Sequence, residues 1–308
     1  MRGRVIKSTG MLCAVLADNG QKISCRIRGN FRIKNIKTTN PVAVGDWVDF
    51  NIDPIEQTGI IDKIEPRKNY IIRKSINLSK QSHIIAANVD EAFLLVTVQQ
   101  PRTSTGFIDR FLITAEAYHI PVSLVFNKID LWDEKATLAA EELIQLYQKI
   151  GYPCYKISAL EKNIFELKSV MEGKTSLLAG HSGVGKSTLL NVLNPELDLR
   201  TGGISKAHHK GTHTTTFAEM LEIGNNGFLI DTPGIKELGI VDMKKEEVAH
   251  YFPEMRAQMQ HCKFNNCLHV NEPKCAVITA LEKGEIAASR YNSYLSIING
   301  EEMTTEYE

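Results

Sequence analysis

The stretch that decides the fold runs from residue 180 to residue 187 and reads Gly180-His181-Ser182-Gly183-Val184-Gly185-Lys186-Ser187. It has the G-x-x-x-x-G-K-[ST] spacing of a phosphate-binding loop, between an apolar run at 176–179 and a helix-compatible run that starts at Thr188. The glycines let backbone N–H groups surround phosphates, and the start of the helix adds positive potential. We expect Lys186 to reach the β- and γ-phosphates of a nucleotide and the Ser187 hydroxyl to bind Mg²⁺.

A second motif, Asp231-Thr232-Pro233-Gly234, follows the apolar run 227–230. An acid at a strand end can hold Mg²⁺ through water, so we expect this role for Asp231 and a contact between the Gly234 N–H and the γ-phosphate. Asp-x-x-Gly alone is also a common turn. Between the two motifs, the stretch 194–216 contains Gly211-Thr212-His213-Thr214-Thr215-Thr216. We expect Thr214 or Thr215 to complete the Mg²⁺ shell.

The motif Asn127-Lys128-Ile129-Asp130 follows the apolar run 122–126 and predicts guanine recognition. The Asp130 carboxylate can accept hydrogen bonds from the N1–H and the exocyclic amino group of guanine, which adenine cannot supply as a pair. We expect Asn127 to brace the neighbouring loops and the Lys128 stem to lie along the base. Ser158-Ala159, after the run 154–157, can offer a backbone N–H to guanine O6.

The order of these motifs is circularly permuted. In ordinary small GTPases the phosphate loop comes first and the base-reading motifs come last, whereas here residues 127–130 and 158–159 precede 180–187. The same sheet can be built with displaced termini, because chain ends usually lie near each other at the surface. An ATP-using P-loop kinase or ATPase is the alternative, and Asp130 argues against it.

Apolar runs and helical patterns alternate from about residue 83, which predicts an α/β fold with a parallel sheet. Before it, about five short strands separated by turn residues predict a small barrel, for which an OB-like barrel and another small barrel fit equally well. The chain after residue 239 is expected to be mainly helical. We therefore predict three domains: a barrel at 1–66, a GTPase domain at 67–239 and a metal-binding domain at 240–308.

Composition sets the expected environment. The formal net charge is zero, and no apolar run is long enough to span a bilayer, so we expect a cytoplasmic protein with no membrane partner. We also expect a monomer. Nine Lys and Arg residues and one acid occur up to Lys37, which is compatible with a polyanionic partner or simply with a solvated face.

Cys262-x4-Cys267-x-His269-x5-Cys275 supplies three thiolates and one imidazole. This set suits one tetrahedral Zn²⁺ with no open position, which is a structural site. His261 competes with His269 for the histidine position, and three buried free cysteines are the simpler alternative. A small C-terminal module would gain folding free energy from the metal.

Together these motifs resemble the RsgA (YjeQ/YloQ) family of ribosome-biogenesis GTPases. Val44-Gly45-Asp46-Trp47-Val48 is similar to the OB-fold domain of that family, and the cysteine cluster followed by Arg290-Tyr291-x-x-Tyr294 is similar to its zinc domain. The resemblance implies a cytoplasmic bacterial factor that binds the small ribosomal subunit and its 16S rRNA late in maturation. It further implies cycling between GTP and GDP, stimulation by the subunit, and release on hydrolysis. A GTP-switched regulator of protein partners, with little RNA contact, is the alternative.

The catalytic group is a separate hypothesis. Many small GTPases orient the attacking water with a glutamine soon after Asp-x-x-Gly, but here Ile235, Lys236 and Glu237 follow. The imidazole of His213, between the candidate Mg²⁺ threonines, could hydrogen-bond this water once a partner orders the loop. The alternative is that His213 only contacts rRNA or solvent.

Overall fold

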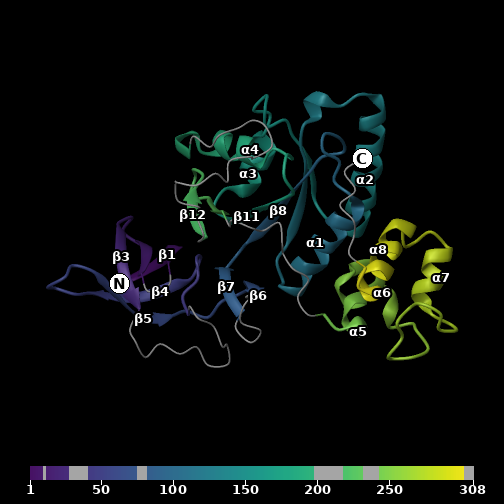
Figure 1. The fold of residues 1–308 in the computed structure, drawn as a ribbon, viewed down its shortest axis with the longest axis horizontal. Coiled ribbons are helices and arrows are strands. Elements are labelled where there is room, and N and C mark those ends of the chain that lie inside the picture. Colours follow the sequence, from purple (N-terminus) through teal and green to yellow (C-terminus); the bar gives the residue numbers. More distant parts are fainter. Residues whose placement is uncertain (10–11, 28–40, 75–81, 198–217, 232–242, 302–308) are drawn as a thin grey trace. The chain divides into compact units, whose positions relative to one another are not determined.

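The computed structural model describes residues 1–9, 12–27, 41–74, 82–197, 218–231 and 243–301 (Figure 1). The chain forms two compact units. Unit 1 comprises residues 1–93, 164–179 and 186–239, and unit 2 comprises residues 94–163, 180–185 and 240–308. The chain passes between them several times, so these units differ from the three predicted domains, whose boundaries stay a prediction. Among the described residues, no helix combines the length and the hydrophobicity needed to cross a bilayer.

Unit 1 contains a closed five-stranded barrel. Its strands are β1 (Arg2–Ser8), β2 (Leu12–Ala17), β3 (Lys22–Ile27), β4 (Trp47–Ile52) and β5 (Gly59–Ile64). They are hydrogen-bonded in the order β1-β2-β3-β5-β4, and β1 also pairs with β4, which closes the barrel. This arrangement confirms the predicted OB-like barrel.

Alternating apolar residues fill the barrel. In β2, Cys13, Val15 and Ala17 are buried while the residues between them are half-buried, as expected when one face of a strand meets a core. Val48, Phe50 and Ile61 contribute from the opposite strands, and the whole core comprises Val5, Cys13, Val15, Ala17, Cys25, Val42, Val48, Phe50 and Ile61.

The remaining elements of unit 1 belong to the expected α/β region, apart from the strand pair β6 (Tyr70–Lys74) and β7 (Ser82–Ala87). They are α3 (Phe165–Met171), β11 (Thr175–Ala179), α4 (Lys186–Leu193), η2 (Pro195–Leu197), β12 (Glu219–Glu222) and β13 (Phe228–Asp231). Strand β11 runs parallel to β13, and β12 runs antiparallel to β13. On its other side β12 pairs with β1, in the register Lys7↔Glu219. Strand β8 (Glu91–Val96) begins in unit 1 and ends in unit 2.

Unit 2 carries the start of the α/β region. Its elements are α1 (Thr105–Ala117), β9 (Val122–Phe126), η1 (Ile129–Leu131), α2 (Glu134–Ile150) and β10 (Cys154–Lys156). Strand β9 lies between β8 and β10 and runs parallel to β10. Both long helices begin at side-chain caps: Ser104 Oγ accepts from Phe107 N at 3.3 Å and Asp133 Oδ1 from Ala136 N at 2.7 Å.

The C-terminal part of unit 2 is helical, as predicted. It contains α5 (Lys245–Val248), η4 (Ala249–Tyr251), α6 (Pro253–Met259), α7 (Ala276–Glu282) and α8 (Ala288–Asn299), drawn in green to yellow in Figure 1. The apolar side chains of Phe252, Met255, Val277 and Tyr294 form its centre. Helix α8 also packs on α1, so this module is joined to the α/β part of unit 2.

Candidate nucleotide and metal sites

The segment Gly180–Gly185 forms the turn that the phosphate-loop motif predicts. Gly180 has a φ of 142° and Gly185 a φ of 100°, both in the region that side chains rarely adopt. A Cβ on Gly180 would lie 2.8 Å from the carbonyl oxygen of Leu95, and a Cβ on Gly185 would collide with the amide nitrogen of Asn127. The motif therefore needs glycine at both positions for backbone shape and for space.

Asn127 joins three of the predicted segments. Its side chain is buried, with 2% exposed. Its Nδ2 donates to the carbonyl oxygen of Val184 at 2.8 Å, and its Oδ1 accepts from the backbone N–H of Ala159 at 3.0 Å. One amide thus ties the end of β9 to the phosphate loop and to the Ser158-Ala159 turn. This is the bracing geometry expected of Asn127.

Asp130 lies in η1, beside Ser158. The hydroxyl of Ser158 donates to Asp130 Oδ1 at 2.5 Å, which orients the carboxylate and leaves Oδ2 outside this bond. The Lys128 ammonium donates to the carbonyl oxygen of Gln100 at 2.5 Å. Burial lowers the pKa of Lys128, and the nearby Asp130 opposes this shift. The two base-reading segments, 127–130 and 158–159, are therefore adjacent in unit 2.

The other predicted nucleotide residues are only partly described. Lys186, Ser187 and Thr188 form the first turn of α4, directly after Gly185 in the chain, and Ser187 is exposed. Asp231 is the last residue of β13. His213, Thr214, Thr215 and Gly234 lie outside the described residues. The roles of all these residues stay predictions.

His181 has partners that the motif alone does not predict. Its Nε2 lies 2.7 Å from Thr103 Oγ1, and its Nδ1 lies 3.1 Å from the carbonyl oxygen of Ser182. The imidazole also meets the ring of Phe107 edge-on, with centroids 5.6 Å apart. Thr103 precedes α1, and Phe107 lies in its first turn. No periodicity or motif in that stretch marks either residue as a neighbour of the phosphate loop.

The cysteine motif forms one compact cluster. The ligand atoms of Cys262, Cys267, His269 and Cys275 all lie within 4.8 Å of one another. Nδ1 of His269 is 3.3 Å from Cys275 Sγ and 3.6 Å from Cys262 Sγ, and the two sulfurs are 3.9 Å apart. A tetrahedral ion with bonds of about 2.3 Å to sulfur and about 2.0 Å to nitrogen separates its ligand atoms by about 3.5–3.8 Å. These four side chains therefore fit such an ion.

His269, not His261, completes this cluster. His261 is exposed and its Nε2 lies 3.3 Å from the Gln260 amide. His269 is 1% exposed, and burial lowers the pKa of its imidazole, which favours the neutral form that binds metals. Its loop is held by the Glu272 carboxylate, which accepts from Leu268 N at 2.7 Å and Val270 N at 2.9 Å.

Comparison with known protein families agrees with the barrel and the nucleotide-binding motifs described above. The model of the RsgA N-terminal domain matches residues 2–61, and the model of the RsgA GTPase matches residues 64–241. The chain belongs to the RsgA GTPase family. A protein of Christiangramia forsetii named "Small ribosomal subunit biogenesis GTPase RsgA" is 55% identical over 98% of this chain and 97% of its own. One of the same name from Phocaeicola vulgatus is 54% identical over the same shares.

Solved structures extend the similarity to the fold. The crystal structure of YjeQ from Thermotoga maritima is 39% identical, with a TM-score of 0.80 over 97% of each chain. The circularly permuted GTPase YloQ is 31% identical, with a TM-score of 0.76 over 97% of this chain and 94% of its own. The permuted α/β P-loop GTPase fold with its N-terminal barrel is therefore established for this RsgA-family chain.

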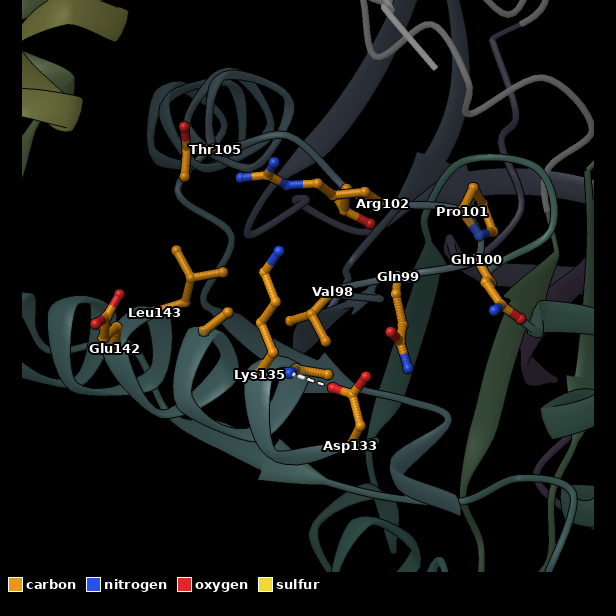
Figure 2. Close-up of a pocket in the computed structure, with 13 residues that line it drawn as sticks. Val98, Gln99, Gln100, Pro101, Arg102, Thr105, Asp133, Lys135, Glu142 and Leu143 are labelled. Atoms are coloured by element: carbon orange, nitrogen blue, oxygen red, sulfur yellow. Dashed lines mark hydrogen bonds between the residues drawn. The ribbon is translucent and has the colours of Figure 1, made fainter. Parts of the chain in front are cut away.

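The RsgA-family chain also has a cavity of about 700 Å³ between the segment after β8 and the start of α2. Figure 2 shows Arg102, Lys135, Val98 and Leu143 among the residues that line this cavity. None of the predicted nucleotide-binding residues lines it. The cavity nevertheless adjoins them, because its lining residue Gln100 accepts from Lys128 and its lining residue Thr103 is hydrogen-bonded to His181.

Proposed function

We propose that this protein is a GTP hydrolase that acts in the late maturation of the small ribosomal subunit. The observation that carries the proposal is the identity of 55% and 54% to two proteins named for this role, each across 98% of the chain. The alignments cover 98% of this chain and 97% of each relative, so they include all parts of the described protein. The protein works in the cytoplasm as a monomer that alternates between GTP and GDP.

The nucleotide contacts follow from the motif residues. The backbone of Gly180–Gly185, with His181, Ser182, Gly183 and Val184 between its ends, surrounds the phosphates, and Lys186 and Thr188 contribute from the start of α4. Asp130 reads guanine while Asn127, Lys128, Ile129, Ser158 and Ala159 shape the base site. The bonds of Asn127 to Val184 and Ala159 support this assignment, because they hold the base-reading and phosphate-binding segments in one arrangement.

Magnesium and the attacking water complete the reaction. Ser187 would bind the ion, Asp231 would hold it through water, and Thr214 or Thr215 would complete its shell in the GTP state, while the Gly234 N–H would contact the γ-phosphate. When bound, the ion would supply positive charge against the phosphates. His213 orients the water, and contact with the ribosomal subunit orders the loop that carries it.

The Cys262, Cys267, His269 and Cys275 cluster holds one structural Zn²⁺. Four protein ligands leave no open position, so the ion contributes folding free energy and no chemistry. The distances of 3.3–3.9 Å between the ligand atoms of Cys262, His269 and Cys275, with Cys267 Sγ within 4.8 Å of each, support this proposal.

The barrel docks on 16S rRNA through basic residues near the N-terminus. Several of these are paired with acids: Arg2 with Glu65, Lys7 with Glu219, and Arg26 with both Asp53 and Glu56. Arg28, Arg32, Lys34 and Lys37 lie outside the described residues. We assign part of the docking charge to this second group.

GTP turnover with and without purified small subunits tests the function, with large subunits as the control. Small subunits should accelerate hydrolysis and large subunits should not. Conversion of GTP to GDP should then release the protein from the small subunit. His213→Ala should abolish the stimulated turnover while GTP affinity and subunit binding persist. Equal stimulation by large subunits would refute the proposed partner. Loss of subunit binding in the His213 variant would make this residue a contact instead of a catalytic group.

A further inference from the structure

The phosphate loop rests on the segment between β8 and α1. A Cβ on Gly183 would lie 3.2 Å from Pro101 Cδ, and the imidazole of His181 meets Phe107 at an interplanar angle of 87°. Thr103, 3% exposed, lies between these two contacts in the sequence. The side chain of His181 is therefore directed to the segment 101–107.

The hydrogen bonds around His181 fix its tautomer. The carbonyl oxygen of Ser182 can only accept, so the His181 Nδ1 that lies 3.1 Å from it must carry the proton. Nε2 of the neutral ring is then an acceptor, and the Thr103 hydroxyl at 2.7 Å donates to it. The same hydroxyl oxygen accepts from the backbone N–H of Thr97 at 3.1 Å. These bonds form a directed chain from Thr97 through Thr103 and His181 to Ser182.

The last bond of this chain sets the direction of a peptide group. Ser182 O and the N–H of Gly183 belong to one planar peptide unit, and in the trans form they point to opposite sides. Because His181 holds this oxygen on the side of the segment 101–107, the bond also fixes the direction of the Gly183 N–H, which points the opposite way. An inward N–H is what phosphate binding in such a loop requires.

We propose that His181 is a positioning residue for the nucleotide phosphates. It holds the Ser182–Gly183 peptide so that the Gly183 N–H donates to the β-phosphate, and Thr103 in turn holds the imidazole. This role rests on the proposed GTP site, and it makes the segment after β8 part of the phosphate-binding apparatus. If the His181 ring served only for packing against the loop, removal of its Nδ1–H would have no effect on phosphate binding.

Two pairs of variants separate orientation from packing. His181→Leu replaces the imidazole by an apolar side chain of similar size and removes the donor, whereas the Asn amide of His181→Asn can place an N–H where Nδ1 lies. Thr103→Val removes the hydroxyl, whereas Thr103→Ser retains it. His250→Ala, an exposed histidine on η4, is the matched control. Thermal unfolding of each nucleotide-free variant shows whether it folds.

The measurements are GDP affinity and the ³¹P signals of bound GDP. His181→Leu and Thr103→Val should bind GDP about tenfold more weakly, the effect of one hydrogen bond to a charged group. Their β-phosphorus signal should move from the wild-type position. His181→Asn and Thr103→Ser should restore both values, and His250→Ala should match the wild type.

Failure of the proposed function and failure of the positioning role give different results. If the wild type does not bind GDP, the proposed function itself fails. If the wild type binds and His181→Leu gives the same affinity and the same β-phosphorus signal, the positioning role is overturned. Equal losses in His181→Leu and His181→Asn would also overturn it, because packing would then explain the effect.

Discussion

At the scale of single residues, we predict that guanine selectivity depends on one carboxylate. Asp130 Oδ1 accepts from Ser158 at 2.5 Å, so the side chain is already oriented before a base arrives. Asp130→Asn replaces an acceptor by an amide that can face the exocyclic oxygen of xanthine. We expect at least about a tenfold loss of GTP affinity, since a buried polar pair is left mismatched, and a gain for xanthosine triphosphate.

Competition binding with both nucleotides measures this change. Asp133→Asn is the matched control, because the same substitution three positions on keeps a good helix cap for α2. It should leave the preference for GTP unaltered. An Asp130→Asn protein that still prefers GTP would show that another residue reads the base.

Residues of a motif were predictable because their spacing encodes a ligand contact, while their supporting partners were not. The sequence placed Asn127 as a brace but could not say that its partners are Val184 and Ala159. Thr103 was not predicted as a site residue, because a single threonine before a helix is typical of an ordinary loop. Its meeting with His181 arises from long-range folding, 78 positions apart in the chain.

At the scale of elements, the cysteine cluster packs against the C-terminal helices. Cys275 directly precedes α7, and Cys262 and Cys267 pack against the same core as Phe252 and Tyr294. We expect metal analysis to give about one Zn²⁺ per chain, lost in the Cys262→Ser/Cys275→Ser double variant. Removal of the metal should unfold α6–α8 while GTP binding persists.

Circular dichroism after chelation measures the loss of helix, and nucleotide titration of the same sample reports the GTP site. Cys154→Ser changes a thiol outside the cluster and should retain zinc. Full retention of zinc in the double variant would contradict the assigned ligands.

A second element-scale prediction concerns the contact between α8 and α1. Arg290 is fully buried and donates to Asp109 at 2.7 Å and to Glu254 at 2.7 Å. Burial opposes its charge, but the two carboxylates outweigh burial and raise its pKa. Arg290→Met leaves two acids without their counter-charge, so unfolding free energy should fall by about 3–5 kcal/mol.

Urea unfolding of Arg290→Met and Arg256→Met tests this difference. Arg256 pairs with Glu116 on the surface, at 51% side-chain exposure, so its loss should cost about 0–1 kcal/mol. An Asp109→Asn/Arg290→Met double variant should lose less than the sum of the single variants. Equal small losses for both arginines would show that the buried network is not a main source of stability.

Regular elements followed from apolar patterns, with errors where the pattern is short. The apolar run 122–126 coincides with β9, and the helical patterns expected to alternate with such runs correspond to α1 and α2. In α2 the buried residues include Ala140, Ile144 and Tyr147, while Leu143 lines the cavity. Strand β12 was not predicted, because four residues that begin and end with Glu give too little alternation.

At the scale of the whole molecule, the barrel is hydrogen-bonded directly to a strand of the α/β region. Strand β1 pairs with β12, and Lys7 binds Glu219 there at 3.2 Å. Strand β12 follows the segment that carries the candidate Mg²⁺ threonines, and β13 ends at Asp231. The chain then continues into the metal-binding module. Only chain order was available from the sequence for this arrangement, because strand pairing between distant segments leaves no local pattern.

If the barrel docks on rRNA, binding must release counterions. Association with small subunits should therefore weaken steeply as salt rises, with a logarithmic slope of roughly one per neutralised phosphate. Replacing Arg26, Arg28 and Arg32 by Gln should weaken binding and flatten this slope by up to about three, without changing GTP affinity. Arg26 should contribute least of the three, since Asp53 and Glu56 already pair with it.

The control for this triple variant must lose three positive charges outside the barrel. Lys149→Gln, Lys168→Gln and Lys283→Gln together remove three exposed cations from α2, α3 and the end of α7. Sedimentation with subunits across a salt series should give this control the wild-type slope. If both triple variants reduce the slope alike, net charge and not the barrel governs association. If neither changes it and binding is insensitive to salt, contact with rRNA phosphates is not the main interaction, and a protein surface of the subunit takes its place.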